Sequence, residues 1–453
     1  MAVSVPPPRS VQIGYGIGSF CSGTFSTVPG LLLLYYLTNV LAVPAGVAGL
    51  VVFLPKAWDL VINPYVGRWS DRSGTRRPWL LGGAATLPVA FVLVFAGPPL
   101  RGMAAALFVG AMFFLAATAY ALFEVPYKAM PAEMTDDYHE QSRLLSWRMA
   151  FVGIAILLSG AVAPALVNIE GGEASIGGYR LMGVVVGVIL LVAMVATYLG
   201  TAGAPRIARG QTEQHVPLSR QLWAARENRD FVQLVAFTSV QMLAVGIMLA
   251  GAPYFATYVL GDTRATTTMF LALVGPIIIT MPLWTRLARR LEKRGAMILA
   301  SVLFLAGGGA MVLTPAFGAG YAHACVVVIG IGYAGVQLLQ FSMLADTLVA
   351  DALRSGKHRT GVFTGLWTAI ETVVLALGAL LLGWTLSLVG FIESEADETV
   401  TQSDRVVDTI LYGGSLLPAA LIAVAIALTL RYRLTADHLA ELHARTADPE
   451  RAG

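Results

Sequence analysis

The chain has 453 residues, of which 57% are hydrophobic and only 13% are charged, and its formal net charge is +3. Soluble domains carry about 25% charged residues, so this composition excludes a water-soluble globular protein of this length. The basic residues are dispersed between apolar runs and form no single patch, which gives no indication of a nucleic-acid partner. The two cysteines, Cys21 and Cys325, lie far apart in apolar runs, and we expect buried free thiols.

Apolar runs of membrane-spanning length recur along the whole chain. Each is long enough to cross about 30 Å of hydrocarbon. Because the runs do not alternate as barrel strands do, we predict an all-α polytopic membrane protein. The twelve predicted transmembrane helices cover approximately residues 11–37, 44–66, 78–97, 103–128, 145–167, 179–200, 230–256, 265–286, 296–315, 320–346, 361–391 and 407–430.

The distribution of Lys and Arg predicts the orientation. Most of the 30 basic residues fall in the termini and in the loops that follow even-numbered spans. By the positive-inside rule these segments are cytoplasmic. We therefore expect a multi-pass protein of the plasma (inner) membrane with both termini in the cytoplasm.

The middle of the chain divides it into two halves. Residues 201–229 hold five Arg and no long apolar run, so we expect a cytoplasmic linker there. The basic loop GRWSDRSGTRRP of the first half has a weaker counterpart, TRLARRLEKRG, in the second half. Such internal repeats predict two pseudo-symmetric six-helix bundles, residues 1–200 and 230–430, with a substrate site between them. We expect residues 431–453 to form a cytoplasmic tail.

Asp59 is the most informative residue, because a carboxylate in the middle of a membrane helix costs about 2.5–3.5 kcal/mol on insertion scales. Lys56 lies one turn earlier on the same face, so one interpretation is a structural ion pair. The other is a cation-coupling carboxylate that takes H⁺ or coordinates a transported Na⁺. Asn63, one turn further on, adds a neutral oxygen ligand on that face.

Glu124 is the second intramembrane acid. Lys128 follows it by four residues, the favourable order for a helical ion pair, so the pair is either structural or a contact for substrate or cation. Tyr120 shares this face and is a candidate partner for a hydroxyl-bearing ligand. Arg148 either extends to the membrane interface or reaches into the cavity as a donor.

In the second half, Glu371 is the acid buried within the span at 361–391. Trp367, Thr368 and Thr372 lie beside it, and we expect this face to contact the substrate. Gln337 and Gln340 in the preceding span are interpreted as contacts between helices.

The charged cytoplasmic loops are predicted to contain a conformational latch, in which charge pairs hold one state and break when the two halves move. Its predicted members are Asp71, Arg72, Arg76, Arg77, Glu133, Asp136 and Arg143. The alternative is that these residues only anchor the topology.

Several catalytic motifs are absent or misleading. The sequence contains no P-loop and no HExxH motif, so we expect no ATP hydrolysis, no enzyme activity, no resident metal and no cofactor. The glycines Gly330, Gly332 and Gly335 match a dinucleotide fingerprint by spacing. Because they lie inside an apolar span, we interpret them as small residues for helix packing. An ion gradient is then the source of energy for uphill transport.

The motifs YGIGSF, KAWDLVINP, VPYKAMPAEMTDDYHEQSRLLSWRM and SMLADTLVADALRSGKHRTGVFTGLWTAIE, with the loop GRWSDRSGTRRP, carry a family resemblance. The chain resembles the major facilitator superfamily and, within it, the glycoside–pentoside–hexuronide:cation symporters of the melibiose-permease group. The resemblance implies a cation site at Asp59, assisted by the residue at position 63 and by Glu124. Arg148 matches a sugar-contacting Arg of the family.

The sequence also departs from the family pattern. Asn63 stands where sodium-coupled members usually carry Asp, and Gly23 lies where a sugar-binding acid is expected. Lys128 replaces a sugar-stacking Trp, and Thr372 replaces a common Lys. We therefore expect an H⁺- or Na⁺-coupled symporter of a small sugar- or glycoside-like solute, a monomer surrounded by membrane lipid. The alternative is a carrier or flippase of a lysophospholipid-like substrate, since related vertebrate members carry lysophospholipids.

Overall fold

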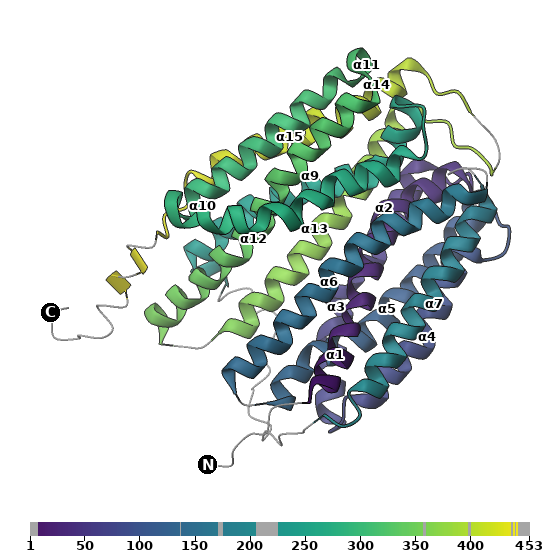
Figure 1. Cartoon of the computed structure of the whole chain (residues 1–453). Coiled ribbons are helices and arrows are strands. Elements are labelled where there is room, and N and C mark those ends of the chain that lie inside the picture. The colour runs from purple at the N-terminus through teal and green to yellow at the C-terminus, as the bar shows by residue number, and fades with distance from the viewer. Residues whose placement is uncertain are drawn as a thin grey trace. The chain divides into compact units, whose positions relative to one another are not determined.

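The computed structural model describes residues 8–135, 137–170, 175–204, 225–356, 359–396, 400–435, 438–439 and 441–442. These residues are helical or irregular, apart from one isolated antiparallel bridge between Leu41 and Glu395, which confirms the all-α prediction. The helices of the first half, shown in Figure 1, are α1 (Arg9–Ile17), α2 (Ser19–Asn39), α3 (Ala45–Arg72), α4 (Arg77–Ala96), α5 (Gly102–Met134), α6 (Tyr138–Val167) and α7 (Ile176–Gly200). Those of the second half are α9 (Arg229–Tyr254), α10 (Ala265–Ala310), α11 (Thr314–Phe317), α12 (Ala319–Ser355), α13 (Thr360–Val389), α14 (Asp404–Gly414) and α15 (Leu416–Thr429).

Ten helical stretches within the described residues are long and apolar enough to cross a membrane. One of them, Ala265–Ser355, has 91 residues and covers three of the predicted spans. Two residues with positive φ interrupt it: Glu292 (φ 59°) inside α10 and Gly318 (φ 80°) just before α12. Glycine adopts this conformation readily, whereas Glu292 does so at a conformational cost. The stretch is therefore not one continuous straight helix.

The first predicted span consists of two helices, α1 and α2, which meet at Gly18. Glycine is a weak helix former, and here it also makes room for a neighbouring side chain. A Cβ atom at Gly18 would lie 2.6 Å from the ring of Tyr127 on α5. The absence of a side chain at Gly18 therefore lets α5 approach this span closely.

The chain forms two compact units. Unit 1 comprises Met1–Glu213, Ala252–Thr267 and Ala379–Val407, so it contains α1 to α7 and two short parts of the second half. Within it α4 packs against α5 and α7, α2 against α6, and α3 against α5. The turn between α2 and α3 is joined to the loop after α13 by backbone hydrogen bonds. Ala42 N donates to the Ser394 carbonyl, and Ser394 N donates to the Thr38 carbonyl, each at 3.1 Å.

Unit 2 comprises Gln214–Gly251, Thr268–Gly378 and Asp408–Gly453. Its core gathers large buried side chains that include Phe237, Trp284 and Trp367. Two of its helices approach so closely that a Cβ atom at Gly378 of α13 would lie 2.4 Å from the carbonyl carbon of Gly246 on α9. Small residues thus set the helix spacing, as is usual in membrane bundles.

The three glycines of the apparent dinucleotide fingerprint have the same packing function. A Cβ atom at Gly330 would lie 2.3 Å from the Leu273 carbonyl oxygen, and one at Gly332 would lie 2.6 Å from the Ala300 carbonyl oxygen. At Gly335 it would meet the Trp284 ring at 2.6 Å. All three lie inside α12, so the packing interpretation is confirmed.

Candidate functional site

Unit 1 contains a cluster of charged side chains within its apolar helices. Asp59 on α3 and Glu124 on α5 are the two acids, with 6% and 3% of their surface exposed. Because a buried charge is costly unless it is paired and hydrogen-bonded, the partners of these two carboxylates determine what the cluster can do.

Glu124 is surrounded by three donors. The Ser22 hydroxyl of α2 donates to its Oε2 at 2.6 Å. Lys128 Nζ, one turn later on α5, lies 3.0 Å from Oε1, and Arg148 Nη2 of α6 lies 3.3 Å from the same oxygen. One carboxylate thus faces two cations, and the Nε atom of Arg148 is buried without a hydrogen-bond partner among the described residues. The arrangement leaves donor capacity for a further anionic or hydroxyl group.

The Arg148 side chain also lies against aromatic residues. Its guanidinium carbon is 5.9 Å from the centre of the Tyr127 ring, and Tyr127 stacks on Tyr15 with ring centres 4.7 Å apart. The Tyr127 hydroxyl donates to the Tyr15 carbonyl at 2.7 Å. Of the two alternatives for Arg148, the structure has the guanidinium directed to Glu124 inside the bundle.

Lys56 occupies an aromatic cage. Its ammonium nitrogen is 4.1 Å from the centre of the Phe25 ring, 5.7 Å from that of Phe113 and 5.8 Å from that of Tyr120. Phe25 and Tyr120 stack on each other with ring centres 4.6 Å apart. Aromatic faces attract a cation by about 2 kcal/mol or more when it is desolvated.

Asp59 is not paired with Lys56. Within the described part of the chain, no ion pair joins the two side chains, and Asp59 Oδ1 is buried without a hydrogen-bond partner. Trp58 separates them in sequence and donates to Thr118 of α5 at 3.1 Å. Asn63, the next residue on this face, is half-buried. Lys56 and Asp59 still act on each other electrostatically, so the choice between a structural pair and a cation-coupling site stays a prediction.

The predicted polar face of the second half lies on the part of α13 that belongs to unit 2. Trp367 is buried and its Nε1 has no hydrogen-bond partner among the residues described. Glu371 is half-buried within electrostatic range of the Tyr333 hydroxyl of α12. Thr372 donates to the Thr368 carbonyl at 2.9 Å.

The two glutamines of α12 contact each other along the helix. Gln337 donates to the Tyr333 hydroxyl at 2.7 Å, and Gln340 donates to Gln337. All three residues lie on one helix, so these hydrogen bonds link successive turns of α12 in an i, i+3 and i, i+4 ladder. The role of the pair in joining two helices stays a prediction.

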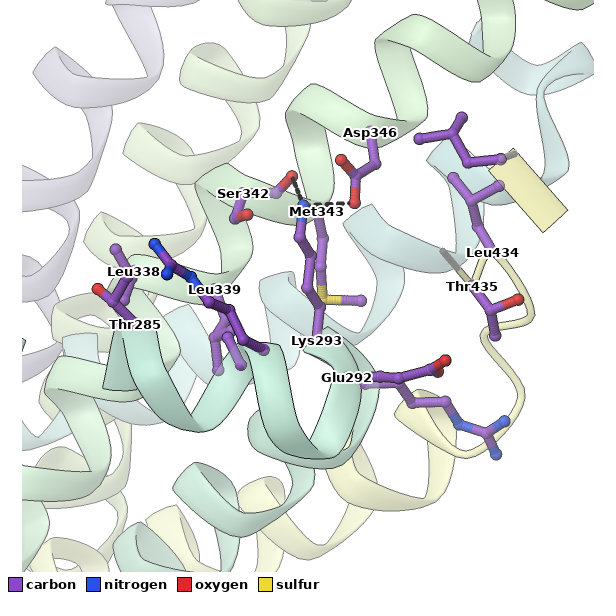
Figure 2. A pocket seen from close by; sticks show the side chains of 14 residues that line it. Thr285, Glu292, Lys293, Leu338, Leu339, Ser342, Met343, Asp346, Leu434 and Thr435 are labelled. Carbon is purple, nitrogen blue, oxygen red and sulfur yellow. Dashed lines mark hydrogen bonds and ion pairs between the residues drawn. The ribbon is translucent and has the colours of Figure 1, made fainter. Parts of the chain in front are cut away.

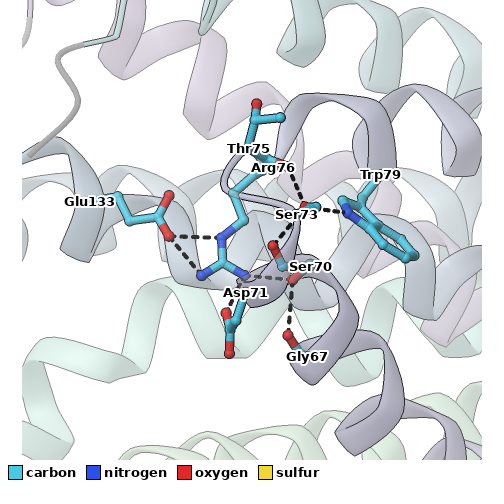
Figure 3. A network of polar contacts seen from close by, with 8 residues as sticks. All are labelled: Gly67, Ser70, Asp71, Ser73, Thr75, Arg76, Trp79 and Glu133. Atoms are coloured by element: carbon cyan, nitrogen blue, oxygen red, sulfur yellow. Dashed lines mark hydrogen bonds and ion pairs between the residues drawn. The ribbon is translucent and has the colours of Figure 1, made fainter. Parts of the chain in front are cut away.

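The predicted latch is centred on Arg76 (Figure 3). Its guanidinium pairs with Asp71 at 2.6 Å and with Glu133 of α5, at 2.6 Å from Nη2 and 2.7 Å from Nε. It also donates to the Ser70 hydroxyl. Burial lowers the pKa of Arg76, but the bonds to Glu133 and Asp71 outweigh burial and hold its pKa above the ordinary value. The guanidinium therefore stays charged at any physiological pH.

The other predicted latch residues are dispersed. Arg77 donates to the Tyr198 carbonyl of α7 at 3.1 Å, and its guanidinium carbon is 4.2 Å from the centre of the Tyr198 ring. Arg143 pairs with Glu140, one turn earlier on α6, at 3.1 Å. Arg72 is exposed. Asp136 lies outside the described residues.

Unit 2 has a comparable contact at the equivalent loop. Lys293, in the segment TRLARRLEKRG, pairs with Asp346 of α12 at 2.6 Å and donates to the Ser342 carbonyl at 3.4 Å. Figure 2 shows this pair in a cavity of about 670 Å³ between α10, α12 and the residues that follow α15. The strained residue Glu292 lines the same cavity.

Some residues of these networks were not predicted from the sequence. Ser22 and Ser70 are ordinary small polar residues, and nothing in their local pattern marks them as partners of Glu124 and Arg76. Phe25 and Phe113 lie in apolar runs where aromatic residues are common. The half-buried Lys56 was the available signal, because an ammonium group within a membrane-spanning helix needs aromatic or oxygen partners.

Comparisons with known proteins agree with a transporter fold. Residues 14–436 match the family described as MFS/sugar transport protein. The chain is 24% identical to the inner membrane symporter YicJ of Escherichia coli, with 94% of this chain and 92% of the relative covered. It is 25% identical to the putative glycoside/cation symporter YagG of the same organism, with the same coverage.

Solved structures of similar fold include a bacterial homologue of the human lysosomal transporter Spinster in an inward-facing, unoccupied conformation. Its TM-score is 0.69 at 15% identity, over 94% of this chain and 98% of that one. The nucleoside transporter NupG has a TM-score of 0.66 at 12% identity, over 93% of this chain and all of the other. These relatives and structural neighbours are transporters and not enzymes. The chain is a multi-pass membrane protein that belongs to the MFS/sugar transport family, among whose members it resembles the glycoside–pentoside–hexuronide symporters.

Proposed function

We propose that this protein is a secondary active transporter that moves a small sugar- or glycoside-like solute by alternating access, in symport with H⁺ or Na⁺. The observation that carries the proposal is the buried Asp59 carboxylate, whose Oδ1 has no partner among the described residues. A carboxylate without a partner in an apolar bundle is destabilising, so its presence indicates a function. A travelling cation at Asp59 is such a function, with Asn63 and Glu124 as its further proposed contacts.

The proposed architecture is twelve spans in two six-helix bundles, residues 1–200 and 230–430, with a linker at 201–229. The positive φ angles at Glu292 and Gly318 support counting the 91-residue stretch as three spans. The pairs Arg76–Glu133 and Lys293–Asp346, which join equivalent loops to equivalent helices, support the internal repeat. The protein is proposed to act as a monomer in the plasma membrane with cytoplasmic termini.

The proposed substrate contacts are Tyr120, Glu124, Lys128 and Arg148 from unit 1, and Trp367, Glu371 and Thr372 from unit 2. Arg148 and Lys128 offer charged donors, and Glu124 offers an acceptor, which suits a solute with several hydroxyl groups. Two relatives from Escherichia coli support a sugar- or glycoside-like solute by their names. They are YagG, a putative glycoside/cation symporter, and a glucuronide carrier homologue that is 22% identical.

Alternating access is supported by contacts within unit 1 at the end predicted to face outward. The hydroxyl groups of Thr38 and Tyr254 are hydrogen-bonded at 2.6 Å. Those of Tyr35 and Thr257 are hydrogen-bonded at 3.0 Å. Glu393 accepts from Ala45 N, the first residue of α3, at 2.9 Å. We infer that these contacts close the outer end in this conformation and separate when the solute enters from outside.

The test begins with a thermal-shift screen of the purified protein against glycosides, glucuronides and lysophospholipids. The solute that stabilises the protein is then used for uptake into proteoliposomes under an imposed ion gradient. We expect accumulation by wild type and none by Asp59→Asn, with solute binding retained. Stabilisation by lysophospholipids alone would replace the sugar-like substrate with the lipid-like alternative, and unchanged accumulation by Asp59→Asn would reject Asp59 as the coupling residue.

A further inference from the structure

The position of Lys56 is the observation from which this inference starts. Its ammonium group lies inside unit 1 on α3, among the rings of Phe25, Phe113 and Tyr120. Phe25 belongs to α2, whereas Phe113 and Tyr120 belong to α5, so three helices build the cage. A cage of rings from separate helices is a specific site for a cation.

The carboxylate one turn away lacks a partner of its own. Asp59 Oδ1 accepts no hydrogen bond from any described residue. Other charged or titratable groups that act on this pair are Cys21 of α2, Glu124 and Lys128 of α5. Glu124 already accepts from Ser22 and pairs with Lys128 and Arg148. Lys56 is therefore the cation nearest to Asp59 in sequence, and no carboxylate among the described residues forms an ion pair with it.

Asp59 lacks a cluster of acidic ligands for a metal cation among the described residues. Hard monovalent and divalent cations are held by several oxygen atoms, commonly carboxylates and carbonyls. Among the described residues, no group of three His, Cys, Asp or Glu side chains gathers as a metal site. Of the rings that hold Lys56, Tyr120 lies within electrostatic range of Asp59, and the adjacent Trp58 donates its Nε1–H to Thr118.

We propose that Lys56 is the resident cation of the Asp59 site and that it determines ion specificity by excluding sodium. Residues three apart on a helix share a face. The ammonium group of the flexible Lys56 side chain can therefore occupy two positions, in the aromatic cage or at the Asp59 carboxylate. When the ammonium group moves to Asp59, it neutralises the carboxylate and repels a second cation. The site is then balanced without a metal ion. A proton that binds Asp59 neutralises it in place of the ammonium group, which returns to the aromatic cage, so the coupling ion of the proposed symport is the proton.

The direct test is binding of ²²Na⁺ to the full-length protein in nanodiscs, at constant pH and ionic strength. Wild type is expected to show no saturable binding. Lys56→Met, which keeps the length of the side chain and removes its charge, is expected to gain saturable binding, and the double variant Lys56→Met/Asp59→Asn is expected to lose it again. Lys56→Arg retains a cation and is expected to behave as wild type, whereas Lys128→Met controls for removal of a nearby charge and is expected to bind no sodium.

Saturable ²²Na⁺ binding by wild type that disappears in Asp59→Asn would overturn the proposal. So would a folded Lys56→Met variant, judged by a monodisperse elution profile, that binds no sodium. If Lys56→Met does not fold, Lys56→Gln takes its place, and the wild-type prediction stands as a test in its own right.

The inference rests on the proposed function, and a different result would reject each of them. Sodium binding at Asp59 in wild type would reject the role of Lys56 and leave cation coupling intact. Accumulation that is unaffected by Asp59→Asn would reject the coupling role of Asp59 whatever the sodium measurement gives.

Discussion

Lys56 and Asp59 lie one turn apart on α3, yet the ammonium group of Lys56 is 4.1 Å from the centre of the Phe25 ring and forms no ion pair with Asp59 within the described residues. A permanent ion pair would have made the carboxylate a structural element. A caged cation beside a carboxylate oxygen without a hydrogen-bond partner is instead the arrangement from which we propose a second position of the ammonium group, on Asp59. Such an element is what a transporter needs in order to couple its conformation to an ion.

Glu124→Gln should destabilise the protein and abolish solute binding. The substitution leaves Lys128 and Arg148 without their shared carboxylate, and removal of one partner of a buried ion pair costs about 3–5 kcal/mol. Because Lys128 is 41% exposed, we expect the loss to lie at the lower end of this range. The melting temperature of the purified variant measures this loss of stability. Ser22→Ala, which removes only one hydrogen bond to Glu124, is the matched control and should cost about 1 kcal/mol. Equal melting temperatures for Glu124→Gln and wild type would contradict the role of Glu124.

Arg76 and Glu133 should show energetic coupling. A double-mutant cycle of Arg76→Ala and Glu133→Gln is expected to give a coupling free energy of about 1–2 kcal/mol, since the two side chains are in contact. The same cycle with Arg72→Ala, an exposed neighbour, is expected to give about zero. The measurement is thermal or denaturant unfolding in detergent, together with transport rate. Additive effects for Arg76 and Glu133 would show that the contact is not a latch.

A disulfide across the predicted outer end should stop transport. Leu41 and Glu395 form an antiparallel bridge, so their Cα atoms are separated by about 4.5–5.5 Å, within the range of a disulfide. The variant Leu41→Cys/Glu395→Cys is expected to lose uptake on oxidation and to recover it on reduction. The native Cys21 and Cys325 are buried and should not interfere.

The two single-cysteine variants are the controls for this experiment. Glu395→Cys also removes the ion pair of Glu395 with Arg101, so its own effect on uptake must be subtracted. Undiminished uptake by the oxidised double variant would mean that this end of unit 1 does not open during transport.

The helical class and the approximate helix positions could be predicted from the sequence, because apolar length and the absence of alternation leave few other solutions in a membrane. The interior acids Asp59 and Glu124 could be predicted for the same reason, since their insertion cost makes them conspicuous. The Glu124–Lys128 contact followed from helical spacing alone.

The partners of these residues could not be predicted in the same way. Whether Lys56 pairs with Asp59 or enters an aromatic cage depends on which rings α2 and α5 bring to α3, and this is a property of tertiary packing. The hydroxyl of Ser22 became a partner of Glu124 only through the packing of α2. The backbone bonds of Ser394 to the α2–α3 turn join segments far apart in sequence, and no local pattern marks them.

The coupling role of Asp59 is measured by the steady-state ratio of internal to external solute in proteoliposomes under an imposed potential of about 100 mV. One coupled charge supplies about 2.3 kcal/mol, which corresponds to a ratio of roughly 50 for a neutral solute. We predict a ratio well above one for wild type and a ratio of one for Asp59→Asn, with solute exchange retained. A variant ratio equal to that of wild type would contradict the proposal that Asp59 couples the ion to the solute.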